Sequence, residues 1–372
     1  MTQRVLITGG AGFIGSHLAD ELLALGHHVR VLDSLEQQVH GEAGHRPDYL
    51  NPDVELQRGD IRDPDAVTSA LIGVDSVVHL AARVGVGQSM YQVAGYTDVN
   101  DTGTAVLMQA LTEKPVGRLV VASSMSVYGE GLYLDAEGRP VAVGPRGVGQ
   151  MRAGRWEHEV AGREGVRPAP THEDVRPTLA SVYALNKYVQ ERLCLLIGET
   201  YDIPTVALRF WNCYGTRQAL SNPYTGVLAN FAARLLNGKA PSIFEDGLQR
   251  RDFVHVDDVV QSIRLALTVD AAAGGIFNVG SGVCRTVREA AAALAVAVGR
   301  QDIEPEITGQ CRVGDIRHCW PDIARAREVL GYEPRVSLED GLAELAEWLS
   351  RQIAIDRIDE MRRELAGRGL SA

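Results

Sequence analysis

The stretch RVLITGGAGFIG, residues 4–15, decides the fold of this chain. A short apolar run enters a glycine-rich turn, and an amphipathic segment over 16–25 follows, which predicts a strand, a tight turn and a helix. Gly9 permits the turn, Gly12 leaves room for phosphates, and Gly15 lets the helix pack closely on the strand. This G-x-x-G-x-x-G spacing differs from the G-x-G-x-x-G fingerprint of simple dinucleotide sites. On its own, the pattern also fits a glycine-rich turn in any α/β protein.

An acidic residue supports a dinucleotide site. The run VRVLD, residues 29–33, predicts a second strand that ends in Asp33. A carboxylate there accepts hydrogen bonds from both hydroxyls of an adenosine ribose and repels a ribose phosphate. Arg30 lies inside the strand, before the acid, and is poorly placed to hold such a phosphate. We therefore predict a dinucleotide site that prefers NAD to NADP.

The bulk properties are those of an ordinary globular protein. The chain has 372 residues, 45% hydrophobic and 23% charged, enough for one large domain or two of usual size. Its net charge of −11 argues against nucleic-acid binding and gives no reason for membrane association. The five cysteines are scattered without a C-x-x-C pair, which favours reduced thiols over a disulfide framework or a metal site. No signal peptide or membrane span is recognised, so we expect a cytoplasmic protein. We also expect that the protein needs no metal.

Repeated β-α-β units in the first half predict a doubly wound parallel sheet of the Rossmann type, with helices on both faces. Polar or small residues, such as Asp60, Ala81 and Ser124, follow the strands. Because ligands of such sheets bind beyond the carboxyl ends of the strands, we expect these residues around one site. Further strands are predicted over 54–60, 75–82, 119–124 and 205–210, and helices over 65–71, 100–111 and 181–200.

The second half predicts a smaller C-terminal α/β lobe that closes over the mouth of the sheet. We expect a cofactor domain (mainly 1–210), a substrate lobe (mainly 211–350, with 252–280 returning to the first domain) and a helical tail (351–372). Clefts between lobes are common sites for small ligands. In this half, helices are predicted over 226–236, 259–268, 286–298 and 342–355, and strands over 241–244, 252–256 and 276–279.

The segment 132–176 interrupts the first domain, and we call it the insert. It is rich in Gly, Arg and Pro and has little apolar periodicity. Long structureless segments are uncommon in compact domains, and are often functional or disordered. A short helical piece is predicted over 156–160. We interpret the insert as a surface excursion, with a flap over the substrate or a subunit contact as the alternatives.

Tyr183 and Lys187 lie four residues apart in the predicted helix 181–200 and therefore share one face. A free tyrosine has a pKa of about 10, and a nearby ammonium favours its phenolate form. Such a tyrosine can take a proton from a sugar hydroxyl while hydride leaves the same carbon. Ser124 can hydrogen-bond the same oxygen, and Ser126 is a weaker candidate. In isolation, each pattern is more often structural: a surface pair, or a serine that satisfies a strand end.

Eight motifs then occur in order along the chain. They are TGGAGFIG (8–15), HLAA (79–82), SSMSVYG (123–129), Tyr183-x-x-x-Lys187, RFWNCYG (209–215), QRRDFVHVDDV (249–259), NVGSG (278–282) and RVGDI (312–316). Together they resemble the extended short-chain dehydrogenase/reductase family, and within it the NAD-dependent nucleotide-sugar epimerases and dehydratases. The resemblance covers nearly all of 1–345 and leaves out the insert and the tail beyond about residue 355.

The resemblance implies a role for each matching position. Ser124, Tyr183 and Lys187 match the catalytic positions. The positions implied to bind NAD are Gly9, Gly12, Phe13, Ile14, Gly15, Asp33, Ser34, Asp60, Ile61, Leu80, Ala81, Ala82, Asn100, Tyr183, Lys187 and Phe210. The positions implied to bind substrate are Ser124, Ser126, Asn212, Gln249, Arg251, Arg312 and Asp315.

The two implied arginines suit a diphosphate, because planar guanidinium groups bind phosphate oxygens in pairs. The resemblance therefore implies a nucleotide-diphosphate sugar as the substrate. It also implies a homodimer built from the helices predicted over 100–111 and 181–200.

The two residues after Ser124 bear on the reaction. Family 4,6-dehydratases usually carry an Asp-Glu pair at these positions, but here they are Met125 and Ser126, which cannot supply that acid and base. Dehydration is therefore disfavoured, and no added acid/base groups for a decarboxylase are identified. The remaining economical chemistry is 4-epimerisation, in which a sugar is oxidised to a 4-keto form and hydride returns to the opposite face.

The substrate is suggested by three further runs. QMR (150–152), RWE (155–157) and SNPYTGVL (221–228) resemble the dTDP-6-deoxyhexose branch, and dTDP-L-rhamnose 4-epimerases in particular. The alternatives are a UDP-glucose/galactose or UDP-glucuronate 4-epimerase, and an NAD(P)H-dependent reductase of a nucleotide-linked 4-keto sugar. A non-catalytic dinucleotide-binding scaffold is the alternative of another class, and the intact set of Ser124, Tyr183 and Lys187 argues against it.

Overall fold

The computed structural model describes residues 2–41, 44–224, 226–312, 314–352 and 356–371. Thr225, in the run 221–228, and Val313, in the motif 312–316, lie outside the described residues. So does 353–355, the end of the helix predicted over 342–355.

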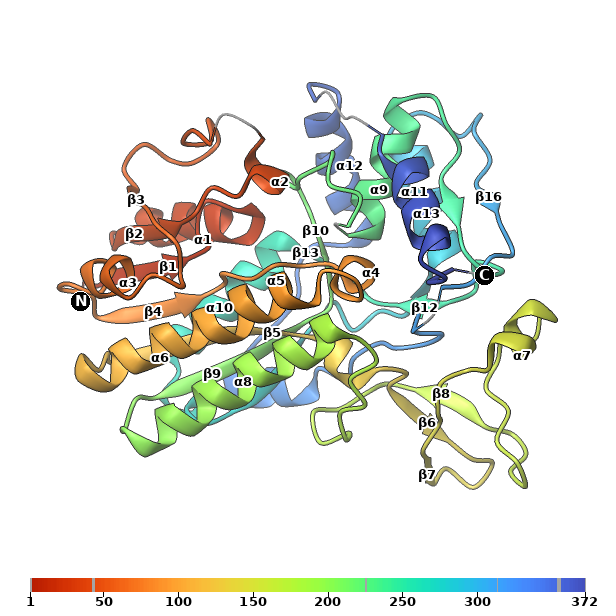
Figure 1. The fold of residues 1–372 in the computed structure, drawn as a ribbon, viewed down its shortest axis with the longest axis horizontal. Helices are drawn as coiled ribbons and strands as arrows, with labels where there is room; N and C mark the ends of the chain where they lie inside the picture. The colour runs from red at the N-terminus through yellow and green to blue at the C-terminus, as the bar shows by residue number, and fades with distance from the viewer. Residues whose placement is uncertain (1, 42–43, 225, 313, 353–355, 372) are drawn as a thin grey trace.

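A seven-stranded parallel sheet forms the centre of the first half (Figure 1), in the order β14-β9-β5-β4-β1-β2-β3. The strand order reverses between β1 and β4, where sheets of this type bind their ligands. This confirms the predicted Rossmann fold. The strands are β1 (Arg4–Thr8), β2 (His28–Asp33), β3 (Glu55–Arg58), β4 (Ser76–His79), β5 (Arg118–Ser124), β9 (Thr205–Phe210) and β14 (Ile276–Val279).

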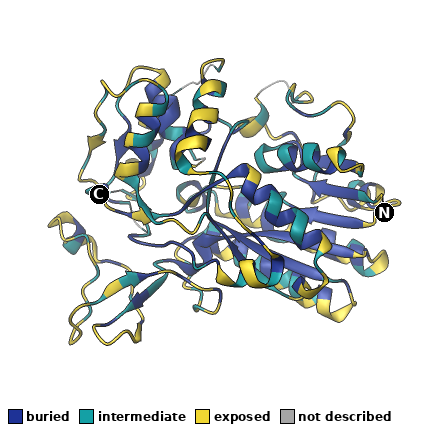
Figure 2. Cartoon of the chain, turned by 180° about the vertical axis from the view of Figure 1, so that it is seen from behind, coloured by how far each residue is buried: buried dark blue, intermediate teal, exposed yellow. Residues whose placement is uncertain are grey.

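Alternate residues of each strand enter two separate hydrophobic cores. In β1, Val5 and Ile7 pack with α1 and α10, whereas Leu6 packs on the opposite face with α3, α6 and α8. This period of two lets apolar strands be buried on both faces, and Figure 2 shows the buried strands between helices with exposed outer faces. The helices are α1 (Phe13–Ala24), α3 (Pro64–Ala70), α6 (Gly103–Glu113), α8 (Val182–Thr200) and α10 (Val256–Thr268).

The second half builds a smaller lobe around its own apolar core. Its helices are α9 (Val227–Leu236), α11 (Val287–Ala297), α12 (Leu338–Leu349) and α13 (Ile358–Gly367). Its strands form three short pairs: β10 (Asn212–Tyr214) with β13 (Phe253–His255), β11 (Ser242–Ile243) with β16 (Glu306–Ile307), and β12 (Arg250–Arg251) with β15 (Arg285–Thr286). Within the segment predicted to return to the first half, α10 covers the large sheet and β14 joins it.

The insert contains structure that its composition did not predict. β6 (Leu132–Leu134), β7 (Pro140–Val141) and β8 (Arg167–Ala169) form an antiparallel sheet that projects at the lower right of Figure 1. The helical piece predicted over 156–160 is wrong: the short helix is α7 (Val148–Arg152). In the later stretch, the carbonyl of Trp156 is bound by Arg146 of the insert and the carboxylate of Glu157 by Arg317 of the smaller lobe.

Short helical turns connect the main elements. They are α2 (Gln37–His40), α4 (Val86–Ser89), α5 (Val93–Thr97), π-helical turns at Asp98–Thr102 and Ala326–Leu330, and 3-10 turns at Met125–Tyr128 and Asp270–Ala272. Among the helices described, none is both long and apolar enough to cross a lipid bilayer.

Candidate active site

A cavity of about 2030 Å³ lies at the carboxyl ends of the sheet strands and extends under the smaller lobe. Every residue predicted for the cofactor, catalytic and substrate sites lines it, except Asn100. Sequence positions more than 300 residues apart, such as Gly9 and Asp315, are thereby brought into one chamber.

The glycine turn after β1 fits a diphosphate. Gly9 has a positive φ of 70°, and a Cβ on it would lie 2.8 Å from the backbone of Ala81 at the end of β4. A Cβ on Gly15 would lie 2.5 Å from Gly10 Cα. Helix α1 begins after Gly12 with no side-chain cap and no acidic residue in its first turn. Its first N–H groups therefore face the cavity with the positive end of the helix dipole, as an anion site requires.

Asp33 is held firmly at the end of β2. Its Oδ2 accepts a hydrogen bond from Ala11 N (3.0 Å), and its Oδ1 accepts one from Leu35 N (2.8 Å). Arg30 points elsewhere, because its guanidinium donates to the carbonyls of Ala70 and Ile72 at 2.8 Å. A fixed carboxylate without an arginine beside it suits a ribose with free hydroxyls, which is the NAD form of the dinucleotide.

Asn100 acts at a distance from the cavity. Its buried amide accepts from Arg83 N (2.7 Å) and donates to Arg83 O (3.1 Å). It therefore fixes the loop that follows β4 and carries Leu80 to Ala82.

The predicted catalytic residues meet where β5 ends and α8 begins. Ser181 caps α8 by accepting from Ala184 N (3.1 Å), and Tyr183 N donates to Ser89 Oγ (3.0 Å), which together fix the position of the tyrosine. Ser126 Oγ donates to Ser124 Oγ (3.0 Å). Burial raises the pKa of Tyr183, while a hydrogen bond with Ser124 lowers it.

Lys187 is buried beneath the tyrosine and is oriented by a residue that the sequence did not reveal. Its Nζ donates to Gln190 Oε1 (2.8 Å), and Gln190 Nε2 donates to Thr104 Oγ1 (2.8 Å). Burial lowers the pKa of Lys187 to about 8, against the opposing influence of Cys194 and Glu191. The i,i+3 spacing of Lys187 and Gln190 on one helix is the signal that could have identified this pair.

The opposite wall of the cavity presents the two predicted arginines. Arg312 pairs with Asp315 (Nη2 to Oδ2 3.0 Å) and lies over the ring of Phe244 at 4.5 Å. Burial raises the pKa of Asp315, but the charges of Arg312 and Arg251 outweigh it and hold that pKa below its usual range. Gln249 donates to the carbonyl of Phe244 (2.8 Å), while its Oε1 is buried without a partner among the described residues.

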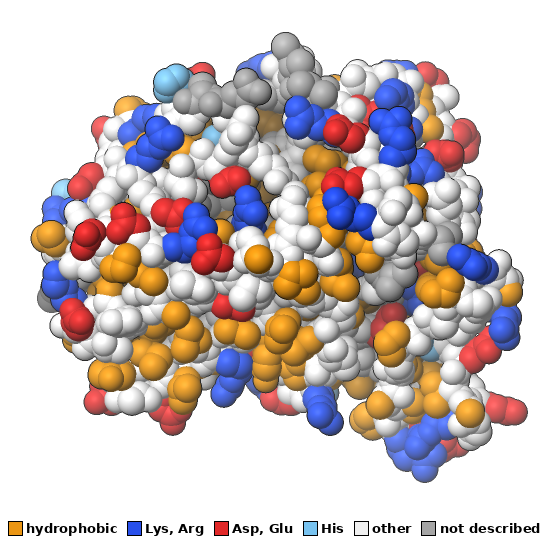
Figure 3. Space-filling view, in the orientation of Figure 1, with side chains coloured by type: hydrophobic (Ala, Val, Ile, Leu, Met, Phe, Trp, Pro, Cys, Tyr) orange, Lys and Arg blue, Asp and Glu red, His pale blue; other side chains and the backbone are white. Residues whose placement is uncertain are grey.

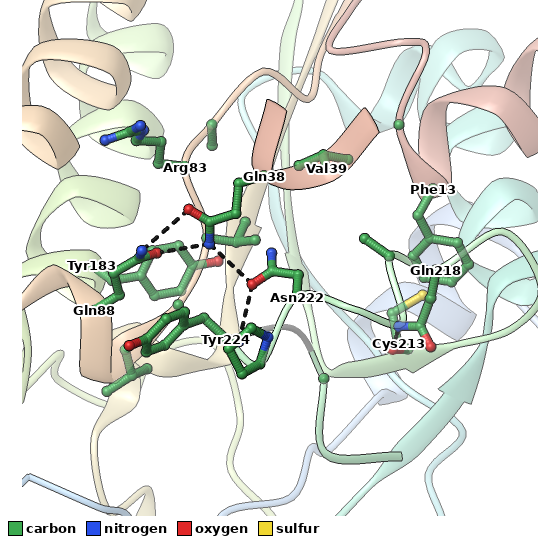
Figure 4. A pocket seen from close by; sticks show the side chains of 18 of the residues that line it. Phe13, Gln38, Val39, Arg83, Gln88, Tyr183, Cys213, Gln218, Asn222 and Tyr224 are labelled. Atoms are coloured by element: carbon green, nitrogen blue, oxygen red, sulfur yellow. Dashed lines mark hydrogen bonds between the residues drawn. The ribbon is translucent and has the colours of Figure 1, made fainter. Parts of the chain in front are cut away.

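Three amide side chains form a bridge across the cavity that sequence reasoning missed. Gln38 on α2 donates to Gln88 Oε1 on α4 (3.1 Å) and to Asn222 Oδ1 in the smaller lobe (3.0 Å), and Gln88 donates back to Gln38 (3.2 Å). Figure 4 shows this amide bridge, Gln38, Gln88 and Asn222, beside Tyr183. It joins the cofactor side of the chamber to the substrate side.

The tail also belongs to the chamber. Helix α13 lines it, and Glu364 accepts hydrogen bonds from the hydroxyls of Tyr91 and Tyr224, each at 3.0 Å. Ile358, Met361 and Leu365 form a small apolar cluster behind this contact. The tail had no motif, so its place in the wall could not be predicted.

Residues 5–146 and 158–280 match the NAD dependent epimerase/dehydratase family. The chain belongs to this family. The gap in the match, 147–157, falls within the insert. Family membership and the geometry above confirm the predicted family and identify the chain as an NAD-dependent nucleotide-sugar epimerase, with NAD as its cofactor.

Named relatives and solved structures resemble the chain over nearly its whole length. It is 34% identical over 356 residues to a dTDP-L-rhamnose 4-epimerase of Burkholderia thailandensis, covering 94% of this chain and 96% of the relative. It is 36% identical over 351 residues to a UDP-glucose 4-epimerase of Mycolicibacterium smegmatis, covering 93% and 98%. A structure of UDP-glucuronic acid 4-epimerase from Bacillus cereus, with UDP-glucuronic acid and NAD, matches with a TM-score of 0.76 at 27% identity, covering 94% and 99%.

Proposed function

We propose that this epimerase inverts carbon 4 of a dTDP-6-deoxyhexose such as dTDP-L-rhamnose. The observation that carries the reaction type is the replacement of the dehydratase acid pair by Met125 and Ser126. Met125 is buried and its sulfur accepts from Asn212 (3.5 Å), while Ser126 donates to Ser124. The similarity to the Burkholderia dTDP-L-rhamnose 4-epimerase favours this sugar.

The side chains divide the work of such a reaction. Tyr183 takes the proton of the 4-hydroxyl, Ser124 orients that oxygen, and the Lys187 ammonium stabilises the phenolate. NAD, held by the glycine turn, Asp33 and Lys187, would supply the acceptor and donor of the hydride of carbon 4. Arg251 and Arg312 hold the diphosphate while the 4-keto sugar turns to present its other face, and Tyr183 then gives the proton back.

The residues that would hold the cofactor form what we call the cofactor cradle: the glycine turn after β1, the N-terminus of α1 and Asp33. The N-terminus of α1 would face its diphosphate, Asp33 its adenosine ribose, and Lys187 its second ribose. Each of these groups already lies in the wall of the cavity.

A panel of nucleotide sugars, offered to the purified enzyme without added NAD or NADPH, tests this function. We expect dTDP-L-rhamnose to yield its 4-epimer through many turnovers per enzyme molecule, measured by chromatography. Turnover that requires stoichiometric NADPH would instead identify a ketoreductase.

The same panel decides the sugar and the base. The similarity to UDP-glucose and UDP-glucuronic acid 4-epimerases supports a second candidate, a UDP-hexose 4-epimerase. We expect kcat/KM for dTDP-L-rhamnose to exceed the values for UDP-glucose and UDP-glucuronate by at least tenfold. The reverse order would assign the enzyme to a UDP-sugar.

A further inference from the structure

The insert is joined to the substrate lobe by a cluster of charged side chains, of which three are buried and Glu157 is 60% exposed. We call it the ionic cluster: Arg146 and Glu157 from the insert, and Glu245, Asp246 and Arg317 from the lobe. The side chains of Arg146, Glu245 and Arg317 are only 1–2% exposed. None of the five lines the cavity, so the cluster has no direct contact with a substrate there.

Arg146 connects the insert to the wall that carries Asp315. Its guanidinium pairs with both carboxylate oxygens of Glu245 (2.8 and 3.0 Å). It also donates to the carbonyl of Trp156 and to the carbonyl of Asp315, each at 3.1 Å. The backbone of Asp315 is therefore held from behind, while its side chain pairs with Arg312 in the cavity.

Arg317 connects the same cluster to Arg251. Its guanidinium contacts Glu157 (2.7 Å), Asp246 (2.6 Å) and Glu245 (3.0 Å). Its carbonyl accepts a hydrogen bond from Arg251 Nη1 (3.0 Å). The cluster thus fixes the carbonyl that aims the Arg251 guanidinium.

Glu157 fixes the backbone beside Arg251 as well. Its second carboxylate oxygen contacts His318 Nε2 (2.9 Å), and His318 Nδ1 accepts from Arg250 N (3.1 Å). One carboxylate from the insert therefore orders two consecutive lobe residues, Arg317 and His318.

Such a cluster fixes the positions of the groups attached to it more than it increases the free energy of unfolding. Buried ion pairs regain through Coulomb attraction little more than they lose by desolvation, and apolar replacements are often as stable. Removing one partner, however, leaves a charge uncompensated and lets the attached backbone shift. Small displacements of substrate-positioning groups have large effects on binding and rate.

We propose that the insert is a brace for the diphosphate-binding wall, in which the ionic cluster positions Arg251 and Asp315 for the nucleoside diphosphate of the substrate. Arg146, Glu157 and Arg317 are positioning residues that act through the backbone of 315–317. This inference rests on the proposed function, because it takes that wall as the binding site of a nucleotide sugar.

Glu157→Ala tests the brace, with dTDP and UDP as the probes and calorimetry as the measurement. We expect the Kd for the preferred nucleoside diphosphate to rise at least tenfold, and KM for the sugar substrate to rise similarly. We expect kcat to stay within about threefold and the Kd for NAD within about twofold, because Tyr183 and the α1 cradle are untouched. Glu157→Asp, which keeps the charge, should recover part of the affinity.

Glu159→Ala is the matched control. This exposed glutamate lies two residues away and pairs only with Arg155 within the insert, among the described contacts. This variant should leave the Kd for the nucleoside diphosphate, KM, kcat and the Kd for NAD unchanged. Asp246 belongs to the lobe and pairs with the same Arg317 guanidinium. Asp246→Asn therefore serves as the test variant if Glu157→Ala does not fold.

The outcomes separate the brace from the function. If the parent enzyme binds neither dTDP nor UDP, the proposed function fails and the brace with it. If the parent binds one of them and Glu157→Ala binds it equally well, only the brace is refuted. An equal loss of affinity for NAD and for the nucleoside diphosphate would indicate general damage, and would also refute it.

Discussion

Tyr183 and Lys187 become charged only at a cost in free energy, because Tyr183 is half-buried and Lys187 fully buried near the beginning of α8. Burial raises the pKa of the tyrosine and lowers that of the lysine to about 8. Each group favours the charged form of a neighbour of opposite sign, so a phenolate and an ammonium are most stable when they form together. The pair is suited to moving one proton to and fro rather than to remaining ionised.

Replacing Tyr183 by Phe removes the proposed base and little else. We expect kcat to fall by roughly 10² to 10⁴, the usual contribution of general acid–base catalysis, with NAD binding retained. Steady-state kinetics with the best sugar of the panel measures this. Tyr201→Phe, at the exposed far end of the same helix, should be fully active. Undiminished turnover in Tyr183→Phe would show that another group removes the proton.

Lys187 gives a pH-dependent prediction. The folded pKa of about 8 lies below its ordinary 10.5, so the folded chain loses this proton first as pH rises. The burial cost is complete below pH 8 and declines between pH 8 and 10.5. The free energy of unfolding of Lys187→Met, taken relative to that of the parent, should therefore be about 2–3 kcal/mol higher at pH 7 than at pH 10.

Urea unfolding without NAD at the two pH values measures that difference. Lys114→Met removes an exposed lysine and should show no such change with pH. An equal effect of Lys187→Met at both pH values would mean that the ammonium is solvated in the folded chain.

At this scale the sequence predicted the parts of the site that are local. The glycine turn, Asp33 and the Tyr183–Lys187 pair are short patterns in which spacing alone sets the geometry. Gln38 and Asn222 were missed because they meet across 184 residues of chain, and an amide in a loop carries no pattern. The resemblance implied that Asn100 binds NAD, whereas in the structure its amide is bonded to the backbone of Arg83 in the loop after β4.

Among the elements, α2, α4 and the lobe loop around Asn222 are held together by the amide bridge. Gln88→Leu removes both hydrogen bonds with Gln38 and the acceptor of the Tyr96 hydroxyl (3.0 Å). We expect NAD to dissociate at least fivefold faster, because the two sides of the chamber separate more readily. The rate of cofactor dissociation is measured by loading the enzyme with NADH, adding excess NAD, and following the loss of the fluorescence of bound NADH.

The control for the bridge is Gln301→Leu, which changes an exposed glutamine in a turn of the smaller lobe. It should release cofactor at the parent rate. A Gln88→Leu enzyme that also keeps the parent rate would show that the bridge does not restrain the cofactor.

Element types in the large sheet could be predicted because buried strands and amphipathic helices have strong periodic patterns. Element ends were less accurate: α10 begins at Val256, three residues before the predicted 259, because His255 caps it. The insert could not be predicted, since its order comes from the ionic cluster and not from an apolar period. A segment held by ion pairs with another lobe, through Arg146 and Glu157, has the composition of a loop.

For the whole molecule we propose a homodimer. Helices α6 and α8 pack together on the outer face, where hydrophobic side chains gather in Figure 3. Leu185 and Leu196 on α8 are 46% and 58% exposed, and such a stripe on paired helices suits a matching stripe on a second copy. Leu196→Glu combined with Leu185→Glu should yield monomers in light scattering.

Leu236→Glu, an exposed leucine on α9 in the smaller lobe, is the control and should leave the assembly unchanged. A parent protein that is monomeric at all concentrations would exclude this dimer. So would a double variant with the parent mass.

The hydrogen bonds of Tyr91 and Tyr224 with Glu364 bear on the order in which the chain folds during synthesis. The glycine turn precedes α13 by more than 340 residues and therefore leaves a ribosome well before it. Domains fold largely in the order in which they are synthesised. A nascent chain can thus acquire its cofactor cradle while the substrate side of the chamber still lacks a wall. This order leaves the chamber open on that side until α13 settles against the two tyrosines.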